Sequence, residues 1–307
     1  MRRARYRWYR ASFLFPLIAI AACGAPSDPG PSTIVGYLQN HNISEASGIA
    51  RSQRYPGVFW VVNDDGPSVL YAIDATGKDL GRVNVKDASN RDWEDIASFT
   101  LDGVPYLLAA DIGDNDGDRK DVRIYVIEEP EAGDKKVDYA WRIEFTYPEG
   151  PRDAEAIAVD TENRRVLVLT KRDVPALLYS LPLEPESKKR QYAVRLGVVD
   201  SLPQPSRQDL EFARKINELH WQPTSMDLSN DGTKAVVLTY GGVYLYRRTP
   251  GEDWLDAMHR PPAVISKTRN RQAEAAAFNP DADAVYITLE QRNAPVFRLP
   301  IDGETRQ

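Results

Sequence analysis

Carboxylate, amide and hydroxyl side chains recur at matching places along the 307-residue chain, and they are the residues whose types and spacing could do chemistry. One set begins five similar apolar segments, and a second set lies two residues earlier. A third set comes sixteen or seventeen residues after the first, at the end of the next apolar run. In chain order the three sets are Ser47, Glu94, Glu155, Thr224 and Glu274; Glu45, Asp92, Asp153, Gln222 and Gln272; and Asn63, Asp111, Lys171, Tyr240 and Glu290.

Carboxylates that are crowded together must lose charge, gain cations or bind a metal. Many oxygen ligands, a single cysteine and three histidines favour Ca²⁺ over zinc or copper. Two alternatives stay open. A glutamate at a strand start can cap backbone amides of its neighbour, and Lys171 with Arg152 and Arg172 can neutralise the acids through ion pairs.

The elements that must position these side chains are short β-strands. Each of the five units has β-branched and aromatic runs separated by Asn, Asp, Gly and Pro, which indicates four antiparallel strands per unit. Repeated four-stranded units predict an all-β fold, a β-propeller with five blades. Six blades are the alternative, because the stretch 177–223 is long, and a β-sandwich is a further one. The last unit lacks a fourth strand, and we expect Ile34–Leu38 to supply it and close the ring.

In such a blade the first strand lines the central channel and the second pairs antiparallel beside it. The start of the first strand and the end of the second therefore lie at one rim, so the three sets converge on one acidic opening. The loop 111–118 and a helix predicted over 206–220 emerge at the same rim. Ser206 can cap this helix, and its apolar residues fall on one face.

The N-terminus predicts export and lipid anchoring. Residues 1–22 combine five arginines with a twelve-residue apolar run, as in a secretory signal, and the run is too short to span a bilayer. The ending Ile-Ala-Ala-Cys23 resembles the bacterial lipobox, in which the cysteine is acylated, although an ordinary signal with a chance cysteine is the alternative. We expect a lipidated Cys23, a flexible tether over 23–33, and a propeller over 34–307. Gly24 suggests, by resemblance to sorting signals, the outer membrane if the cell has one.

Charge and motifs exclude several functions. Loss of the signal changes the formal net charge from −6 to −11, which disfavours nucleic acid as a partner. The chain contains no G-x-S-x-G, P-loop or H-E-x-x-H motif. Trp93 is expected to pack between blades, and His220 to pack rather than catalyse.

Three segments resemble motifs of secreted bacterial propellers of largely unassigned role: 60–66 (WVVNDDG), 92–97 (DWEDIA) and 111–115 (DIGDN). More distantly, the region 44–299 is similar to gluconolactonase/regucalcin-like and phytase-like propellers. The resemblance implies a calcium at the channel mouth, held through Glu, Asn and Asp side chains. Two features depart from it: the chain has five units where those enzymes have six, and a lysine stands in the third set. Carried over by position, the implied ligands are Glu94, Glu155, Glu274, Asn63 and Asp111.

Two functions remain open from the sequence. The first is a non-catalytic envelope module that binds a small molecule, a glycan or a protein at the mouth, and the second is a calcium-dependent hydrolase of lactones or phosphate esters. Recurrence of similar carboxylates around the ring favours the first, because a hydrolase needs one distinct base or nucleophile. The residues expected to contact a ligand are Lys171, Asp153, Asp92, Tyr240 and Glu290.

Overall fold

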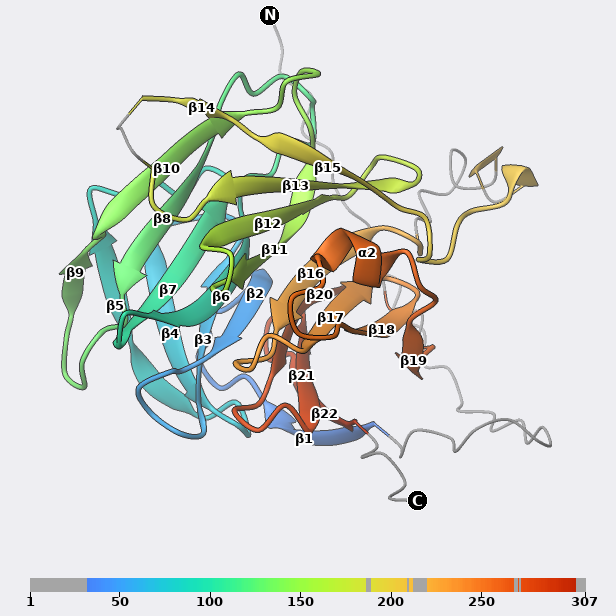
Figure 1. Ribbon diagram of the computed structural model, residues 1–307. Coiled ribbons are helices and arrows are strands. Elements are labelled where there is room, and N and C mark those ends of the chain that lie inside the picture. The colour runs from blue at the N-terminus through green and yellow to red at the C-terminus, as the bar shows by residue number, and fades with distance from the viewer. Residues whose placement is uncertain are drawn as a thin grey trace, which may run out of the picture.

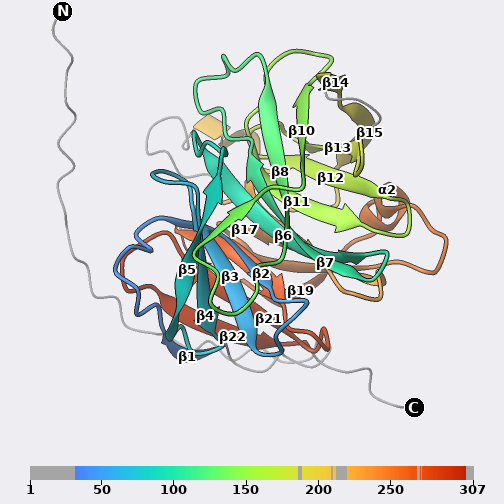
Figure 2. The same cartoon turned by 90° about the vertical axis from the view of Figure 1, so that its left-hand side faces the viewer.

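The computed structural model describes residues 32–185, 189–208, 210–211, 220–267, 270 and 272–301. They form five sheets that follow one another around a ring, the arrangement of a five-bladed β-propeller (Figures 1 and 2). This confirms the all-β prediction and decides in favour of five blades over six. The predicted signal segment, Cys23 and most of the predicted tether lie outside the described residues.

Each blade has four antiparallel strands that run from the channel outward. Blade 1 consists of β2 (Ala46–Arg51), β3 (Val58–Asn63), β4 (Val69–Asp74) and β5 (Asp79–Lys86). Blade 2 consists of β6 (Trp93–Leu101), β7 (Val104–Asp111), β8 (Val122–Glu128) and β10 (Trp141–Thr146). Blade 3 consists of β11 (Ala154–Asp160), β12 (Arg165–Thr170), β13 (Ala176–Pro182) and β15 (Val194–Val199). Blade 4 consists of β16 (Pro223–Leu228), β17 (Lys234–Thr239), β18 (Gly242–Arg247) and β19 (Ala263–Ser266).

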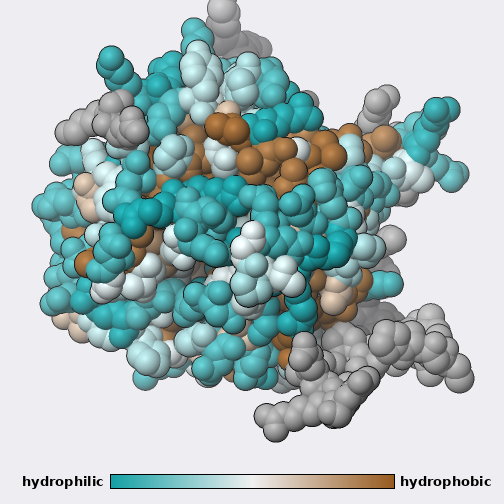
Figure 3. Space-filling view, in the orientation of Figure 1, coloured by the Kyte–Doolittle hydropathy of each residue, from teal (hydrophilic) through white to brown (hydrophobic). Residues whose placement is uncertain are grey.

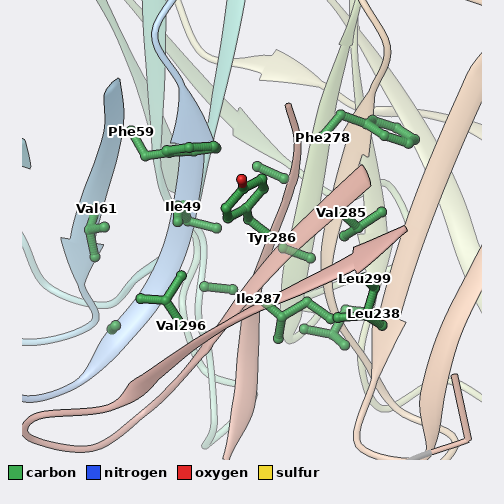
Figure 4. Close-up of a cluster of buried hydrophobic side chains, with 14 of the residues drawn as sticks. Ile49, Phe59, Val61, Leu238, Phe278, Val285, Tyr286, Ile287, Val296 and Leu299 are labelled. Atoms are coloured by element: carbon green, nitrogen blue, oxygen red, sulfur yellow. The ribbon is translucent and has the colours of Figure 1, made fainter. Parts of the chain in front are cut away.

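Blade 5 closes the ring with an N-terminal strand, as predicted. It consists of β20 (Ala273–Phe278), β21 (Ala284–Leu289), β22 (Pro295–Pro300) and β1 (Thr33–Tyr37). β1 pairs antiparallel with β22, and the two lie side by side at the bottom of Figure 1. The apolar cluster of Figure 4 joins this blade to blade 1, with the ring centroids of Phe59 and Tyr286 4.7 Å apart. Closure therefore rests on backbone pairing and on side-chain packing.

Two short strands, which the repeat does not predict, cover outer edges. β9 (Lys136–Asp138) and β14 (Gln191–Tyr192) come from connections within blades 2 and 3. Each pairs in parallel with the outer strand of the preceding blade, β9 with β5 and β14 with β10. Edge strands with unpaired backbone groups are open to further pairing, so these additions protect the two edges.

Blades bury both faces of their inner strands, because each sheet packs against two neighbours. Every residue of β2 and of β20 is buried. Trp93 is fully buried in the apolar cluster shared by blades 1 and 2, as predicted. Most of the surface in Figure 3 is hydrophilic, and hydrophobic residues gather in its upper part, over β13 and β15.

The described helix α2 (Trp254–Met258) lies between β18 and β19, and Asp253 caps it by accepting a hydrogen bond from the backbone N–H of Leu255 at 2.9 Å. The helix expected over 206–220 lies largely outside the described residues, which omit 209 and 212–219. In the described part of the chain, no helix has the length and apolar character that a membrane crossing requires.

Candidate functional site

The first strand of every blade contains a β-bulge at its second residue. A bulge leaves one residue unpaired in the ladder and redirects its side chain. The same backbone irregularity therefore repeats at one rim of all five blades, and all five bulged residues are buried. They are the first polar set of the sequence: Ser47, Glu94, Glu155, Thr224 and Glu274.

Hydroxyl and carboxyl residues at the bulge have different partners. Ser47 Oγ donates to the backbone oxygen of Trp93 at 2.6 Å. Thr224 Oγ1 donates in the same way to the oxygen of Ala273 at 2.8 Å. Each hydroxyl thus binds the first strand of the next blade. A carboxylate has no proton to donate to such a carbonyl, so the glutamates of blades 2, 3 and 5 bring charge to the same position.

Three of the predicted residues come together as a group that could hold a metal ion. Glu94, Asp153 and Glu155 each offer one carboxylate oxygen, and these oxygens lie within 4.8 Å of one another. All three side chains are buried, and among the described residues Glu155 Oε2 has no hydrogen-bond partner. We call these three residues the mouth cluster. It joins two of the implied calcium ligands to Asp153, which was expected to contact a ligand.

Lys171 is the buried cation beside the mouth cluster. Its ammonium pairs with Glu155 Oε1 and lies 5.4 Å from the centre of the Tyr240 ring. Burial lowers the pKa of Lys171, but the charges of Glu155, Glu274 and Glu94 outweigh it and raise the pKa above its usual value. Tyr240 in turn donates to Glu274 Oε1 at 2.5 Å. Lys171 is therefore a charged lysine, and the predicted neutralisation by an ion pair is confirmed for Glu155.

Asp153 is neutralised from outside the channel. Arg172 Nε donates to Asp153 Oδ2 at 2.5 Å, and its guanidinium also contacts Asn115. The backbone N–H of Asp114 donates to Asp153 Oδ1 at 3.0 Å. The loop after β7 therefore forms a wall of the site, as expected. Arg152, the other expected neutralising residue, pairs instead with Asp173 at 3.6 Å.

In the part of the chain that the structure describes, Glu94 forms no ion pair. Burial, the charge of Glu155 and that of Asp92 raise the pKa of Glu94 well above its usual value. Burial also raises the pKa of Asp92, two residues earlier in the chain. Gly113 lies against this pair, and a Cβ there would overlap Glu94 Oε1. A glycine is thus needed for the loop to pack so closely on the two acids.

Asn63 and Asp111, two of the implied calcium ligands, have other partners. Asp111 Oδ1 accepts from Arg119 Nη2 at 2.8 Å and from the N–H of Asp92 at 3.2 Å. Asn63 Nδ2 donates to the backbone oxygen of Asn42 at 2.8 Å. Both side chains thus contact rim loops, while Asp111 Oδ2 and Asn63 Oδ1 are buried without a hydrogen-bond partner among the described residues. Neither residue, nor Glu274, belongs to the metal-binding group found among the described residues.

Asp64 is a site residue that the repeat alignment missed. The backbone N–H groups of Asp64, Lys171 and Glu290 all bond to the residue that precedes the first strand of their own blade. Asp64 is therefore the counterpart of Lys171 and Glu290, and the alignment placed Asn63 there because the first hairpin of blade 1 is one residue longer. The signal that could have found it is the pair Asp64-Asp65, which directly follows Asn63.

Asp64 and Glu290 extend the acidic rim from the mouth cluster toward blades 1 and 5. Burial, then Glu45 and Glu274, raise the pKa of Asp64 to about 7. Burial and the charges of Glu274, Asp64 and Glu45 raise the pKa of Glu290 to about 8. In the described chain no ion pair reaches either residue within 4.0 Å. Both acids therefore change charge near neutral pH.

Two side chains cross the centre of the ring below the mouth. Asp95 of blade 2 accepts hydrogen bonds from the N–H of Ile157 at 3.0 Å and from that of Met226 at 3.3 Å. At the far end, Arg51 of blade 1 pairs with Asp227 of blade 4 at 2.5 Å. The contacts of Asp95 with Met226 and of Arg51 with Asp227 link blades that are not neighbours. Polar side chains therefore also lie in the channel beyond the mouth cluster.

Comparisons with known proteins leave the family open. No family model and no curated protein matches the chain. Among solved structures, hydrazine synthase of Kuenenia stuttgartiensis is 10% identical with a TM-score of 0.42, covering 84% of this chain and 72% of that one. A Bacteroides uniformis protein provisionally assigned as a 6-phosphogluconolactonase is 13% identical with a TM-score of 0.40, covering 85% and 68%. These values carry no argument about activity, and the fold assignment rests on the strand pairing of the chain itself.

Proposed function

We propose that the mouth cluster binds Ca²⁺, and that the metal forms part of a ligand-binding site in a non-catalytic, membrane-anchored propeller. The observation that supports this most directly is Glu155 Oε2, a buried carboxylate oxygen without a partner, beside oxygens of Glu94 and Asp153. Buried polar atoms are nearly always hydrogen-bonded, so an orphaned one marks a place for a ligand.

The donor set fits a hard cation. Ca²⁺ takes six to eight oxygen ligands, and each of the three residues offers one carboxylate oxygen to a common centre. Coordination positions therefore remain for water or for an oxygen of a bound molecule. Tyr240, Asp92 and Glu290 surround these positions with polar groups that suit a small molecule, a glycan or a protein side chain. The acidic surroundings argue against nucleic acid.

Charge balance also favours a divalent cation. Lys171 and Arg172 neutralise Glu155 and Asp153, whereas Glu94 retains its charge only at a cost. A bound dication would remove that cost and favour the ionised forms of Glu94 and Asp92, whose pKa values are raised. Calcium binding should therefore release protons.

The metal proposal is tested by titrating Ca²⁺ into the mature protein, after chelation, by calorimetry in two buffers of different protonation enthalpy. We expect binding with proton release and a gain of about 2.7 kcal/mol in the free energy of unfolding at a hundredfold excess over Kd. Glu155→Gln should abolish both, whereas the exposed control Glu128→Gln should change neither. Equal melting curves in EDTA and in Ca²⁺ would contradict the proposal.

The non-catalytic assignment has its own test. Because Lys171 neutralises Glu155, Lys171→Ala should lower stability, and the protein should not turn over a panel of lactones and phosphate esters. Calcium-dependent hydrolysis that is lost in both Lys171→Ala and Glu155→Gln would instead favour the hydrolase.

Membrane anchoring is tested separately. The basic and apolar N-terminus ending at Cys23 supports it. The protein should fractionate with membranes and be released by Cys23→Ala. A variant with a cleaved signal that still fractionates with membranes would show that the anchor is something else.

A further inference from the structure

A cavity of about 250 Å³ lies on the flank of blade 1, between its sheet and the segment 130–135. None of its lining residues belongs to the mouth cluster or to the loop after β7. The neighbouring strand β9 lies beside β5 on the left of Figure 1. The apolar side chains that line the cavity are Val58, Trp60, Ala72, Leu80, Val83 and Pro130.

Small residues beside a large one create this space. Val58 and Trp60 point to the same face of β3, because strand side chains alternate. Ala72 is the register partner of Trp60, and Gly81 is the partner of Ala72 on the next strand. A Cβ at Gly81 would meet no atom within 4 Å. In the row Trp60–Ala72–Gly81, the small residues at the outer end therefore leave space that no side chain fills.

The segment 130–135 is fixed over this gap. The backbone N–H of Ala132 donates to Tyr55 Oη at 2.9 Å. The backbone oxygen of Lys135 accepts from the N–H of Asn84 at 3.0 Å. The cavity is therefore a formed space between fixed walls. Leu80 lines it and is 47% exposed, so an apolar wall faces water.

Charges around the cavity are unequally compensated. Arg82 and Lys135 line it, and within the described chain neither makes an ion pair. The two acids beside them are engaged, because Glu131 pairs with Arg54 at 3.5 Å and Asp134 Oδ2 accepts from the N–H of Glu131 at 2.9 Å. Since Arg54 compensates Glu131, two cations and the carboxylate of Asp134 remain, which gives the cavity one net positive charge on an otherwise acidic protein.

We propose that this cavity binds a small amphipathic anion, a carboxylate with a short aliphatic or aromatic tail. The tail lies against Trp60 and Leu80, and the head contacts Arg82 and Lys135. The volume is below the roughly 300–1,000 Å³ of sites for drug-sized ligands, which limits the ligand to about the size of a medium-chain carboxylate such as octanoate. This site is independent of the calcium proposal.

Octanoate is the probe, followed by tryptophan fluorescence and by calorimetry of the mature protein. We expect saturable one-to-one binding with a change in Trp60 emission that is absent in Trp60→Phe. Hexanoate should bind more weakly, by roughly fourfold for each methylene removed. Octyl phosphate should also bind, and octylamine should not, because the head contacts are cationic.

Two changes to the protein locate the site. Ala72→Leu fills the space beside Trp60 and should abolish binding while the protein stays folded. Arg82→Gln with Lys135→Gln keeps the apolar walls and should weaken octanoate by about threefold for each cation removed. The matched control is Arg247→Gln, an exposed arginine of blade 4, which should leave binding unchanged.

Several outcomes would overturn the proposal. They are no saturable octanoate binding, unchanged affinity in a folded Ala72→Leu, or octylamine binding as tightly as octanoate. If Ala72→Leu fails to fold, the charge-reduced variant decides, because unchanged affinity there removes the basis for anion recognition.

Discussion

The two ends of the channel both bury carboxylates but compensate them differently. At the far end, Asp227 pairs with Arg51 at 2.5 Å. Asp160 accepts from Arg165 at 3.0 Å and from Arg248 at 3.2 Å. At the mouth, Lys171 and Arg172 stand beside a larger number of acids, and Glu94 has neither as its partner.

This difference separates structural charges from functional ones. A buried carboxylate with its own guanidinium is satisfied, and its removal only damages the fold. A buried carboxylate without a cation costs stability, and ionisable groups perturbed in this way concentrate at functional sites. The ion pairs at the far end therefore hold the blades together. At the mouth, a bound cation would offset the free energy lost by burying uncompensated carboxylates.

The largest expected effect on stability comes from removing the ion pair at the far end of the channel. Arg51→Met leaves Asp227 buried without its cation and should lower the free energy of unfolding by about 3–5 kcal/mol. Urea denaturation measures this, with Arg247→Met as the exposed control. A loss below about 1 kcal/mol would show that the far-end pair is not structural.

The second effect has the opposite sign and comes from the mouth. Glu94→Gln removes a buried acid that has no cation, so without calcium it should raise the free energy of unfolding by about 1 kcal/mol. The matched change at the far end, Asp160→Asn, should lower it, because two arginines lose their counter-ion. Thermal melts in EDTA compare the two, and a loss of stability in both variants would remove the contrast between the ends.

The smallest effect is a pH dependence from Asp64 and Glu290. Their pKa values are raised to about 7 and about 8, so the folded state keeps protons that the unfolded state has lost. The stabilisation is complete below about pH 4 and is lost as pH rises to about 8. Discounted for solvent screening, it is about 1 kcal/mol, or about 2–4 °C in melting temperature.

Melting curves between pH 6 and 9 in EDTA test this dependence. The melting temperature should fall with rising pH in the wild type and fall less in Asp64→Asn with Glu290→Gln. Asp283→Asn, an exposed acid of the same blade as Glu290, serves as the control. An unchanged slope in the double variant would contradict the assignment of these two acids.

Much of the fold could be predicted because a propeller repeats one short unit. Strand runs and turn residues recur at nearly constant spacing, and that spacing indicates four strands per blade without any long-range information. Ile34–Leu38 could be assigned to the last blade because that blade lacked a strand. Strands β9 and β14 could not be predicted. Their parallel partners lie in another blade, and strands of two or three residues are too short to show a periodic pattern.

The candidate site was predictable only in part. Spacing identified Glu94, Glu155 and Asp153, because a repeat places equivalent residues at equivalent positions. It missed Asp64, since one extra residue in a hairpin shifts every later residue by one place. The loop contacts of Asn63 with Asn42 and of Asp111 with Arg119 could not be predicted either, because no spacing reveals them.

The sequence by itself determined the blade unit, the closing strand and the rim at which polar residues gather, whereas the structure decided between five blades and six. These features depend on the local strand pattern and on its repetition, and both can be recognised in the amino-acid sequence. Only the tertiary structure decided which acids meet, which have a cation and which remain uncompensated. Those properties depend on distances of a few ångströms between blades, set by the bulges, by the approach of Gly113 and by the reach of Lys171 and Arg172.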